Sequence, residues 1–412
     1  MTKEARWQMI TATLLIIGYS GYYACRSNLS VCRPQILEEF ASQGIDKAAI
    51  GTITFWGTLA YACGKLIWGP ITDAVGGRSM FLSGMIGAIL FTLMFAFGPA
   101  PGIFLVAWVG NRLVQSMGWG GMVNVASKWY LPKQYGTIMG FISLSYLFGD
   151  WASRLILGKL IEAGWGWRHV YVAGAGFLAI IFVCCLALLK QRPSKVNLPE
   201  VAGSDVEQEP LKSALKTLTS SPAFWVTCIL SFVFTFVRET FNDWTPTFLV
   251  EVAKLAKDRA AIVSSSFPLF GGFSVLLVGY LADRVPKGGK SLLIGFGLVV
   301  AIPMFFLLGS VSASSGETYL IALLGATAVL ILGPYSLFAG AMALHYGNQR
   351  TAAAAAGLID GIGYFGGMIS AKLIGDVATK SGWQPAWQIL GWIAALGVCV
   401  AIPAWWLERQ SR

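Results

Sequence analysis

Gly18-Tyr-Ser-Gly-Tyr-Tyr-Ala-Cys-Arg-Ser-Asn28 places an arginine inside an apolar run that is long enough to span a membrane. A charge at that depth is costly unless its side chain faces a polar cavity or a partner. On a continuous helix, Tyr19, Tyr22 and Tyr23 fall on the face of Arg26, because they precede it by about one or two turns. The stretch therefore predicts a cation with phenol hydroxyls beside it inside a membrane protein. The alternative is an arginine that snorkels to the membrane interface.

The whole chain has the composition of a multi-spanning membrane protein. Of its 412 residues, 56% are hydrophobic and only 12% are charged. The apolar runs are long and show little alternation, which argues against a β-barrel. We therefore predict an all-α membrane protein. Its twelve transmembrane helices are expected at 8–36, 47–70, 78–98, 101–128, 136–162, 167–190, 221–250, 260–283, 290–311, 317–343, 352–379 and 384–407.

The net charge of +10 could indicate a nucleic-acid partner, but the placement of the charges argues against one. If both termini face the cytoplasm, most lysines and arginines outside the apolar runs lie on the cytoplasmic side, as in other membrane proteins. We therefore expect this orientation, with the basic excess meeting anionic lipid headgroups. The first span is too long for a signal-peptide core, so we expect it to be retained. The expected location is a bacterial inner membrane.

The longest polar segment, residues 191–220, lies between the sixth and seventh predicted spans. We predict that it is a cytoplasmic linker between two six-helix bundles, 1–190 and 221–412. Its residues 211–218 are expected to form an interfacial helix.

Polar positions repeat between the two predicted bundles. Arg26 in the first span corresponds to Arg238 in the seventh, with an offset of 212 residues. Tyr146–Arg154 in the fifth span corresponds to Tyr364–Lys372 in the eleventh, with an offset of 218 residues. Such a duplication is typical of secondary transporters, which bind substrate near the membrane midplane between pseudo-symmetric halves.

The arginines of the first and seventh spans favour an anionic substrate. Neither Arg26 nor Arg238 has a well-directed carboxylate three or four residues away. Two such arginines without built-in counterions favour an anion, and the planar guanidinium group suits phosphate oxygens bidentately. Asn242 follows Arg238 by four residues and is expected on the same helical face.

Two further cations have a carboxylate at helical spacing. Asp150 precedes Arg154 by four residues, and Asp376 follows Lys372 by four. Each pair is either structural or part of a ring that holds the organic part of a substrate. The ring would include two tyrosines of the same spans, Tyr146 and Tyr364.

The sequence predicts neither an enzyme nor a metal or cofactor site. His169 and His345 are far apart in the chain, and no nucleophile–base set or metal-ligand cluster is present in the sequence. All seven cysteines fall in apolar runs without metal-like spacing. We expect them to be small buried residues rather than disulfides or ligands.

Gly69-Pro-Ile-Thr-Asp73-Ala-Val-Gly-Gly-Arg78 resembles the loop between spans 2 and 3 of the major facilitator superfamily, and a related loop recurs at 279–287. Arg112-Leu-Val-Gln115-Ser-Met-Gly118 is similar to the span-4 motif of the same superfamily. The resemblance implies the major facilitator fold, with two pseudo-symmetric six-helix bundles around a central cationic cavity. It also implies a gating or structural role for the charged motif residues, Asp73, Arg78, Arg112, Asp283 and Arg284.

Longer motifs resemble one family of this superfamily, the organophosphate:phosphate antiporters. They are Tyr22-Tyr-Ala-Cys-Arg26-Ser-Asn28, Tyr61-Ala-Cys-Gly-Lys65, Gly333-Pro-Tyr335 and, most specifically, Arg238-Glu-Thr-Phe-Asn-Asp243-Trp-Thr-Pro246. The family includes bacterial glycerol-3-phosphate and hexose-6-phosphate transporters and the endoplasmic glucose-6-phosphate transporter. The resemblance extends over nearly the whole chain.

This resemblance implies that Arg26 and Arg238 hold phosphate and that Lys65 assists them. It also implies that tyrosines of spans 1 and 11 line the site. The chain departs from the family pattern at several positions of spans 5 and 11, so the organic part of the substrate stays open. The substrate-binding residues that we predict are Tyr19, Tyr23, Arg26, Lys65, Trp119, Tyr146, Asp150, Arg154, Arg238, Asn242, Tyr364 and Lys372.

The predicted function is antiport of a small organic phosphate (a sugar phosphate, a glycerol phosphate or a phosphorylated acid) against inorganic phosphate. We expect a monomer that works by alternating access. A proton-coupled symporter of an organic carboxylate or phosphonate is the alternative that Arg112, Asp150 and Asp360 suggest. A sugar-phosphate sensor that does not transport is less favoured, because the linker is of ordinary length.

Overall fold

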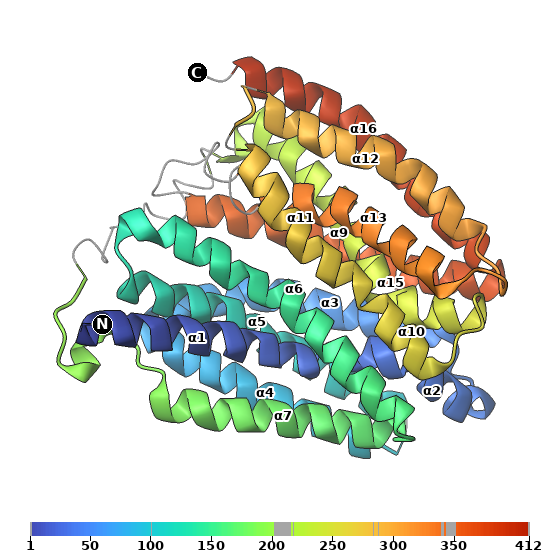
Figure 1. Cartoon of the computed structure of the whole chain (residues 1–412), viewed down its shortest axis with the longest axis horizontal. Helices are drawn as coiled ribbons and strands as arrows, with labels where there is room; N and C mark the ends of the chain where they lie inside the picture. The colour runs from blue at the N-terminus through green and yellow to red at the C-terminus, as the bar shows by residue number, and fades with distance from the viewer. Residues whose placement is uncertain are drawn as a thin grey trace. The chain divides into compact units, whose positions relative to one another are not determined.

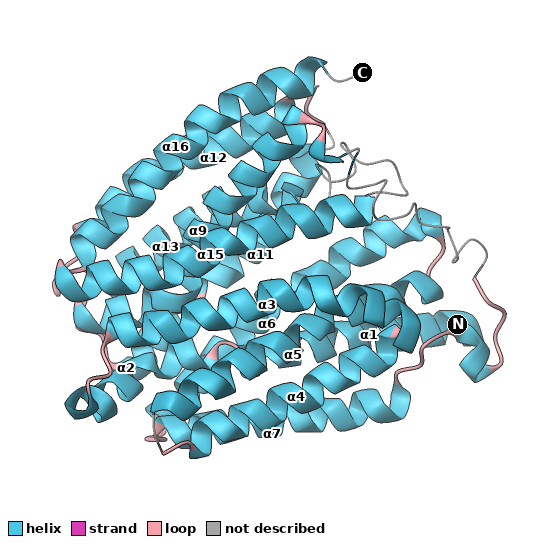
Figure 2. Cartoon of the chain, turned by 180° about the vertical axis from the view of Figure 1, so that it is seen from behind, coloured by secondary structure: helices cyan, strands magenta, loops and turns pink. Residues whose placement is uncertain are grey.

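The computed structural model describes residues 2–99, 101–201, 216, 218–282, 284–286, 288–338, 342 and 352–410. Within these ranges the regular structure is entirely helical (Figure 2). Short 3-10 helices lie at Ala41–Gln43 and Pro193–Val196. The α-helices are α1 (Lys3–Ala24), α2 (Asn28–Phe40), α3 (Lys47–Val75), α4 (Gly77–Phe97), α5 (Pro101–Trp129), α6 (Pro132–Glu162), α7 (Trp167–Leu188), α9 (Pro222–Glu251), α10 (Lys257–Ser264), α11 (Ser266–Ala282), α12 (Gly289–Gly309), α13 (Glu317–Leu337), α15 (Ala352–Lys380) and α16 (Trp383–Gln410).

The chain folds into two compact units. Unit 1 comprises Met1–Ile36 and Trp56–Val206, and unit 2 comprises Leu37–Phe55 and Glu207–Arg412. Helix α3 therefore begins in unit 2 and ends in unit 1. The bundle boundaries at 190 and 220 stay a prediction, and most of the predicted interfacial helix lies outside the described residues.

Among the described residues, seven helical stretches are long and apolar enough to cross a membrane. The other five predicted spans correspond to α1 with α2, and to α3, α5, α6 and α15. The all-helical architecture predicted from hydropathy is thus confirmed. The seven stretches are Gly77–Phe97, Trp167–Leu188, Pro222–Glu251, Lys257–Ala282, Gly289–Gly309, Glu317–Leu337 and Trp383–Gln410.

The first predicted span is not one helix, because a turn at residues 25–27 separates α1 from α2. The amide nitrogens of Cys25 and Arg26 bind carbonyl oxygens three residues back, which tightens the chain locally. Asn28 then begins α2, and its Oδ1 accepts from the amide of Leu29 at 2.8 Å. Arg26 therefore lies at a helix break rather than in a helix interior.

A second break divides the eighth predicted span into α10 and α11. Ser265 lies between them, and Pro268 follows in the first turn of α11. Proline has no N–H group, so the carbonyl of Ser264 loses the partner that a continuous helix would give it. Hydropathy alone does not detect such a break, because both segments are apolar.

Glycines on α4 and α5 of unit 1 allow the backbones of these two helices to come into direct contact. A Cβ atom on Gly77 would lie 2.5 Å from the carbonyl oxygen of Gly121. A Cβ atom on Gly121 would lie 2.7 Å from the carbonyl oxygen of Gly77. This close packing fixes α5, which carries Arg112 and Trp119, against the core of unit 1.

A buried carboxylate caps one helix of unit 2. Helices α12 and α16 run side by side (Figure 1). The side chain of Glu408 on α16 is buried, and its Oε2 accepts from the amide of Ser291 at 2.9 Å. This satisfies an amide at the N-terminus of α12, where negative charge is also favourable to the helix dipole.

Candidate functional site

Arg26 extends from the turn between α1 and α2 toward aromatic rings of unit 1. Its Nη1 donates to the hydroxyl of Tyr23 at 3.2 Å, as the spacing of three residues predicts. Its Cζ lies 4.5 Å from the ring centroid of Tyr61 on α3. Arg26 is half-buried, so part of the residue is accessible.

The ring of Tyr61 is shared by three cations. Besides Arg26, the Cζ of Arg112 lies 4.7 Å from its centroid and the Nζ of Lys65 lies 5.2 Å from it. The face of an aromatic ring attracts each cation, whereas the three like charges repel one another. The Tyr61 cluster, which consists of Arg26, Tyr61, Lys65 and Arg112, is therefore a strongly positive region that suits an anion with several oxygen atoms.

The sequence assigned Arg112 to a gating or structural motif, and the structure places it in the Tyr61 cluster. Arg112 is 3% exposed and also lies 6.0 Å from the ring centroid of Trp108. Two polar neighbours of Arg112 on α5 are hydrogen-bonded to each other, since Gln115 Nε2 donates to Asn111 Oδ1 at 2.6 Å. Arg112 is thus held between aromatic rings near the phosphate-binding residues that the sequence predicts.

Three aromatic side chains, Tyr23, Tyr19 and Trp119, contact one another in this order, starting beside Arg26, and we call this group the aromatic wall. Tyr19 makes edge contacts with Tyr23 and with Trp119 of α5, with centroids 6.0 and 5.5 Å apart. Tyr22 turns away from Arg26, since its hydroxyl donates to the carbonyl of Phe81 on α4 at 2.5 Å. The prediction that all three tyrosines face Arg26 is therefore wrong for Tyr22.

Arg238 on α9 lies between two tyrosine rings of unit 2. Its Cζ is 4.5 Å from the ring centroid of Tyr335 on α13 and 5.4 Å from that of Tyr364 on α15. Tyr364 is one of the substrate-binding residues that the sequence predicts. Tyr335 adds a second ring, and its hydroxyl donates to Asp360 Oδ1 at 3.2 Å.

The prediction that Arg238 lacks a built-in counterion is wrong. Its Nη2 lies 2.7 Å from Oε1 of Glu239, and each side chain is only 9% exposed. Asn242 Nδ2 donates to the same Oε1 at 3.4 Å, so Asn242 contacts the counterion of Arg238. Helical spacing does not predict this pair, because adjacent helical residues point about 100° apart and only long side chains bridge that angle.

In unit 1, Asp150 holds Arg154 on α6. The Nε of Arg154 lies 3.1 Å from both carboxylate oxygens, and the side chains are 3% and 8% exposed. The hydroxyl of Ser27, next to Arg26, also donates to Asp150 Oδ1. Of the two alternatives that the sequence left open, this geometry supports the structural pair.

Other predicted ring residues are less enclosed. Lys372 Nζ lies 3.1 Å from Asp376 Oδ2, but these side chains are 46% and 28% exposed. Tyr146 is partly buried and packs against the hydrophobic core of unit 1. Lys372 therefore lies on an accessible face of α15.

The motif residues that resemble the superfamily loops are mainly helix caps where they are described. Arg78 donates from Nε to the carbonyl of Leu189 at 2.6 Å and from Nη2 to that of Leu186 at 2.7 Å, so it caps the C-terminus of α7. Arg284 lies 3.5 Å from the ring centroid of Tyr280 and donates to its carbonyl. Asp283 and the side chain of Asp73 lie outside the described residues.

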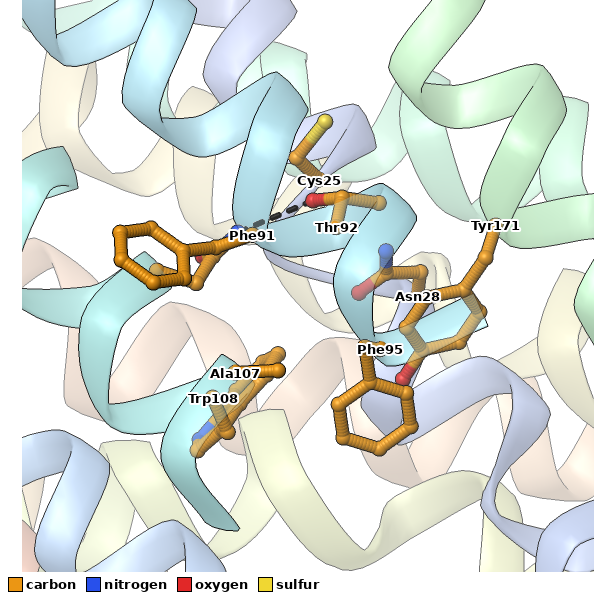
Figure 3. A pocket seen from close by; sticks show the side chains of 9 residues that line it. Cys25, Asn28, Phe91, Thr92, Phe95, Ala107, Trp108 and Tyr171 are labelled. Carbon is orange, nitrogen blue, oxygen red and sulfur yellow. Dashed lines mark hydrogen bonds between the residues drawn. The ribbon is translucent and has the colours of Figure 1, made fainter. Parts of the chain in front are cut away.

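Beside Arg26, the side chains of Cys25, Asn28 and Tyr171 meet those of α4 and α5 around a small void (Figure 3). Asn111 Nδ2 donates to Thr92 Oγ1 at 2.9 Å there. The space between these side chains does not admit a water molecule. The void is therefore part of the packing below Arg26 and not a substrate site.

No group of acidic, histidine or cysteine side chains suited to a metal ion occurs in the part of the chain that the structure describes. All seven cysteines are described and free. Four of them are buried, but Cys63, Cys184 and Cys399 are exposed, so the expectation of uniform burial is wrong. Apolar surface on a spanning helix can face lipid, which explains the difference.

Three residues of these sites were not among the predicted ones: Tyr61, Glu239 and Tyr335. A signal for Tyr61 was present, since it precedes Lys65 by one helical turn and Arg112 and Trp119 mark the neighbouring span. Tyr335 is the last residue of Gly333-Pro-Tyr335, one of the motifs that resemble the antiporter family. Glu239 had no spacing signal of this kind.

Comparison with known proteins places this chain among transporters. The model of the Major Facilitator Superfamily matches residues 15–371. The chain is 23% identical to a probable hexose phosphate transport protein of Chlamydia trachomatis, over 98% of this chain and 92% of the relative. It is 24% identical to the glycerol-3-phosphate transporter of Bacillus subtilis (97% and 90%) and 25% identical to a glucose-6-phosphate exchanger of Mus musculus (83% and 75%).

Solved structures show the same fold. A bacterial homolog of the human lysosomal transporter Spinster superposes with a TM-score of 0.81 at 15% identity, over 100% of this chain and 99% of that one. The nucleoside transporter NupG superposes with a TM-score of 0.73 at 14% identity, over 96% and 98%. At these identities the similarity concerns the fold alone.

Proposed function

Because this chain belongs to the Major Facilitator Superfamily, we propose that it exchanges a small organic phosphate for inorganic phosphate by alternating access. The chain is a multi-pass integral membrane transporter related over nearly its full length to organophosphate transporters. The chemistry of the two arginine sites supports the finer assignment. We further propose a monomer in a bacterial inner membrane, with both termini in the cytoplasm.

The observation that carries this proposal is the Tyr61 cluster. Phosphate carries a charge of about −1.5 to −2 near neutral pH, which suits three cations around one ring. Arginine binds its oxygens bidentately, and the half-buried Arg26 and Lys65 leave part of the cluster accessible. Arg238, held between two tyrosines in unit 2, supplies the second arginine that the resemblance assigns to phosphate.

Charge repulsion gives a reason for exchange rather than net transport. An empty carrier keeps like charges close together in a medium of low dielectric, and a bound anion relieves that repulsion. The loaded carrier is therefore expected to change conformation more readily than the empty one. Inward and outward movements are then linked through a bound anion in each direction.

The organic part of the substrate is proposed to be neutral and hydroxylated. Asp150 neutralises Arg154, so this arginine is a poor site for a second anionic group. The aromatic wall of Tyr19, Tyr23 and Trp119 offers rings and hydroxyls to a sugar or a glycerol moiety. Two of the relatives, a probable hexose phosphate transport protein and a glycerol-3-phosphate transporter, support this substrate class.

A proton-coupled symporter is the second candidate. The observation that favours it is the buried carboxylate of Glu239 in contact with Arg238. A carboxylate beside the substrate cation can take up a proton when the substrate arrives. The two mechanisms differ in whether phosphate efflux requires an anion on the other side of the membrane.

The purified protein in proteoliposomes tests the proposed function. Labelled phosphate outside would be offered to vesicles loaded with phosphate, glycerol-3-phosphate, a hexose 6-phosphate, 3-phosphoglycerate or buffer alone. We expect rapid uptake with the first three, slower uptake with the phosphorylated acid and little with buffer. Equal uptake in every case, including buffer alone, would contradict the proposal.

Replacing Tyr61 with leucine is expected to raise the Km for phosphate about tenfold, since cation–π contacts stabilise a site by about 0.5–2 kcal/mol. Tyr61→Phe keeps the ring and should change the Km by less than about threefold on the same reasoning. Phosphate exchange in proteoliposomes measures both values. An equal rise in Km in both variants would show that the hydroxyl, and not the ring, matters, and two unchanged Km values would exclude Tyr61 from the site.

A further inference from the structure

Glu239 is a buried carboxylate at the centre of the arginine site of unit 2. It contacts Arg238 at 2.7 Å, and both side chains are almost fully enclosed. Arg238 is also the residue that the proposed function assigns to phosphate. The same guanidinium group therefore has two possible anionic partners, one inside the protein and one in the substrate.

Residues of α15 and α9 pack closely around the side chain of Glu239. A Cβ atom on Gly367 of α15 would lie 2.7 Å from Cγ of Glu239, so only glycine leaves this carboxylate its room. Asn242, one turn further along α9, donates its amide to Oε1. The carboxylate position is thus defined by two helices.

Titratable groups near the pair come from α9, where Asp243 follows Glu239 by one turn, and from two helices that pack against it. Tyr335 of α13 and Tyr364 of α15 lie on Arg238, and Asp360 of α15 accepts from Tyr335. Helices α10 and α16 also pack against α9. The charged residues of these helices lie near their ends: Lys257, Asp258 and Arg259 on α10, and Glu408 and Arg409 on α16.

We propose that Glu239 competes with substrate phosphate for Arg238, and that it takes up one proton when the substrate binds. The inference rests on the proposed function, because it assumes that Arg238 binds the phosphate group. A carboxylate and a phosphate group beside one guanidinium repel each other, and burial strengthens the repulsion. Protonation of Glu239 removes it.

The replacement of Glu239 by phosphate on Arg238 requires only a proton from water. In the empty carrier the carboxylate of Glu239 is ionised and paired with Arg238. As phosphate oxygens take over the guanidinium group, a proton from water forms an O–H bond on Glu239. Release of the anion returns the proton to water and restores the ion pair, so the loaded carrier holds one proton more than the empty one.

The test is the Km for phosphate of the wild type and of Glu239→Gln between pH 5.5 and pH 8.5, measured as exchange in proteoliposomes. Glutamine mimics the protonated carboxyl and does not compete for Arg238. Ionisation of phosphate itself affects both proteins equally, so the ratio of their Km values isolates Glu239. We expect the ratio of wild type to variant to be near one at the acidic end and to rise about tenfold at the alkaline end.

Two further variants keep the test decisive. Gly367→Ala displaces Glu239 from its position. The Km of this variant should therefore depend on pH less than that of the wild type, as for Glu239→Gln. Glu317→Gln removes a carboxylate of the same unit that pairs with Arg259 at the surface, and its profile should follow the wild type. A ratio that stays constant across the pH range overturns the proposal. If the wild type exchanges no phosphate at any pH, the proposed function itself has failed.

Discussion

Replacing Arg238 with lysine is expected to lower the rate of phosphate exchange about a hundredfold. An ammonium group cannot form the two parallel hydrogen bonds that a guanidinium group donates to phosphate. Lysine also remains close enough to Glu239 for an ion pair, so the counterion competes more effectively with the substrate. Arg26→Lys should have an effect of similar size, since Arg26 belongs to the Tyr61 cluster. Initial exchange rates in proteoliposomes at equal protein density measure both.

Matched controls exist for both arginines. Arg409 lies 5.0 Å from the ring of Trp405 near the end of α16, and Arg168 lies 4.3 Å from the ring of Trp167 in α7. Both are arginines on aromatic rings outside the two sites, so their lysine variants should keep most of the wild-type rate. Wild-type exchange in both Arg26→Lys and Arg238→Lys would exclude these residues from phosphate binding.

Replacing Arg154 with glutamine is expected to destabilise the protein by about 3–5 kcal/mol, because it leaves Asp150 as a buried charge without its cation. Lys372→Gln, in contrast, breaks an accessible pair and should cost less than about 1 kcal/mol. Thermal unfolding of the purified variants in detergent compares them under identical conditions. The double variant Asp150→Asn with Arg154→Gln should recover much of the loss, because neither charge remains.

The same pair of variants decides between the structural and the substrate-binding roles. If Arg154 binds the organic part of the substrate, Arg154→Gln should weaken competition by organic phosphates while phosphate:phosphate exchange and stability stay unchanged. A fall in stability with both exchanges reduced in parallel supports the structural pair. Lys372→Gln serves as the reference, since it removes a cation from the corresponding helix of unit 2.

Most of the fold was predictable from the sequence, because membrane spans depend on the local sum of hydropathy. Helix breaks were not. The turn at Arg26 depends on local hydrogen bonds at Cys25–Ser27, and the break before α11 depends on Pro268, whereas the flanking segments stay equally apolar. The division of α3 between the two units was also unpredictable, because it results from tertiary packing.

The candidate sites were partly predictable. Contacts between residues three or four apart in the chain followed the expected spacing, as for Arg26 with Tyr23 and for Asp150 with Arg154. Contacts between helices did not, since single-sequence spacing says nothing about which faces meet. The convergence of Arg26, Lys65 and Arg112 on Tyr61 needs three segments to pack together, and the enclosure of Glu239 needs a glycine on another helix.

The most direct test of exchange is the efflux of labelled phosphate from preloaded proteoliposomes in the presence of a protonophore. We predict rapid efflux when phosphate or an organic phosphate is present outside and very slow efflux into plain buffer, with the proton gradient collapsed throughout. Protonation of Glu239 does not alter this expectation, because each bound anion carries the same proton in either direction. Equally rapid efflux into plain buffer, without any external anion, would contradict exchange and favour proton-coupled symport.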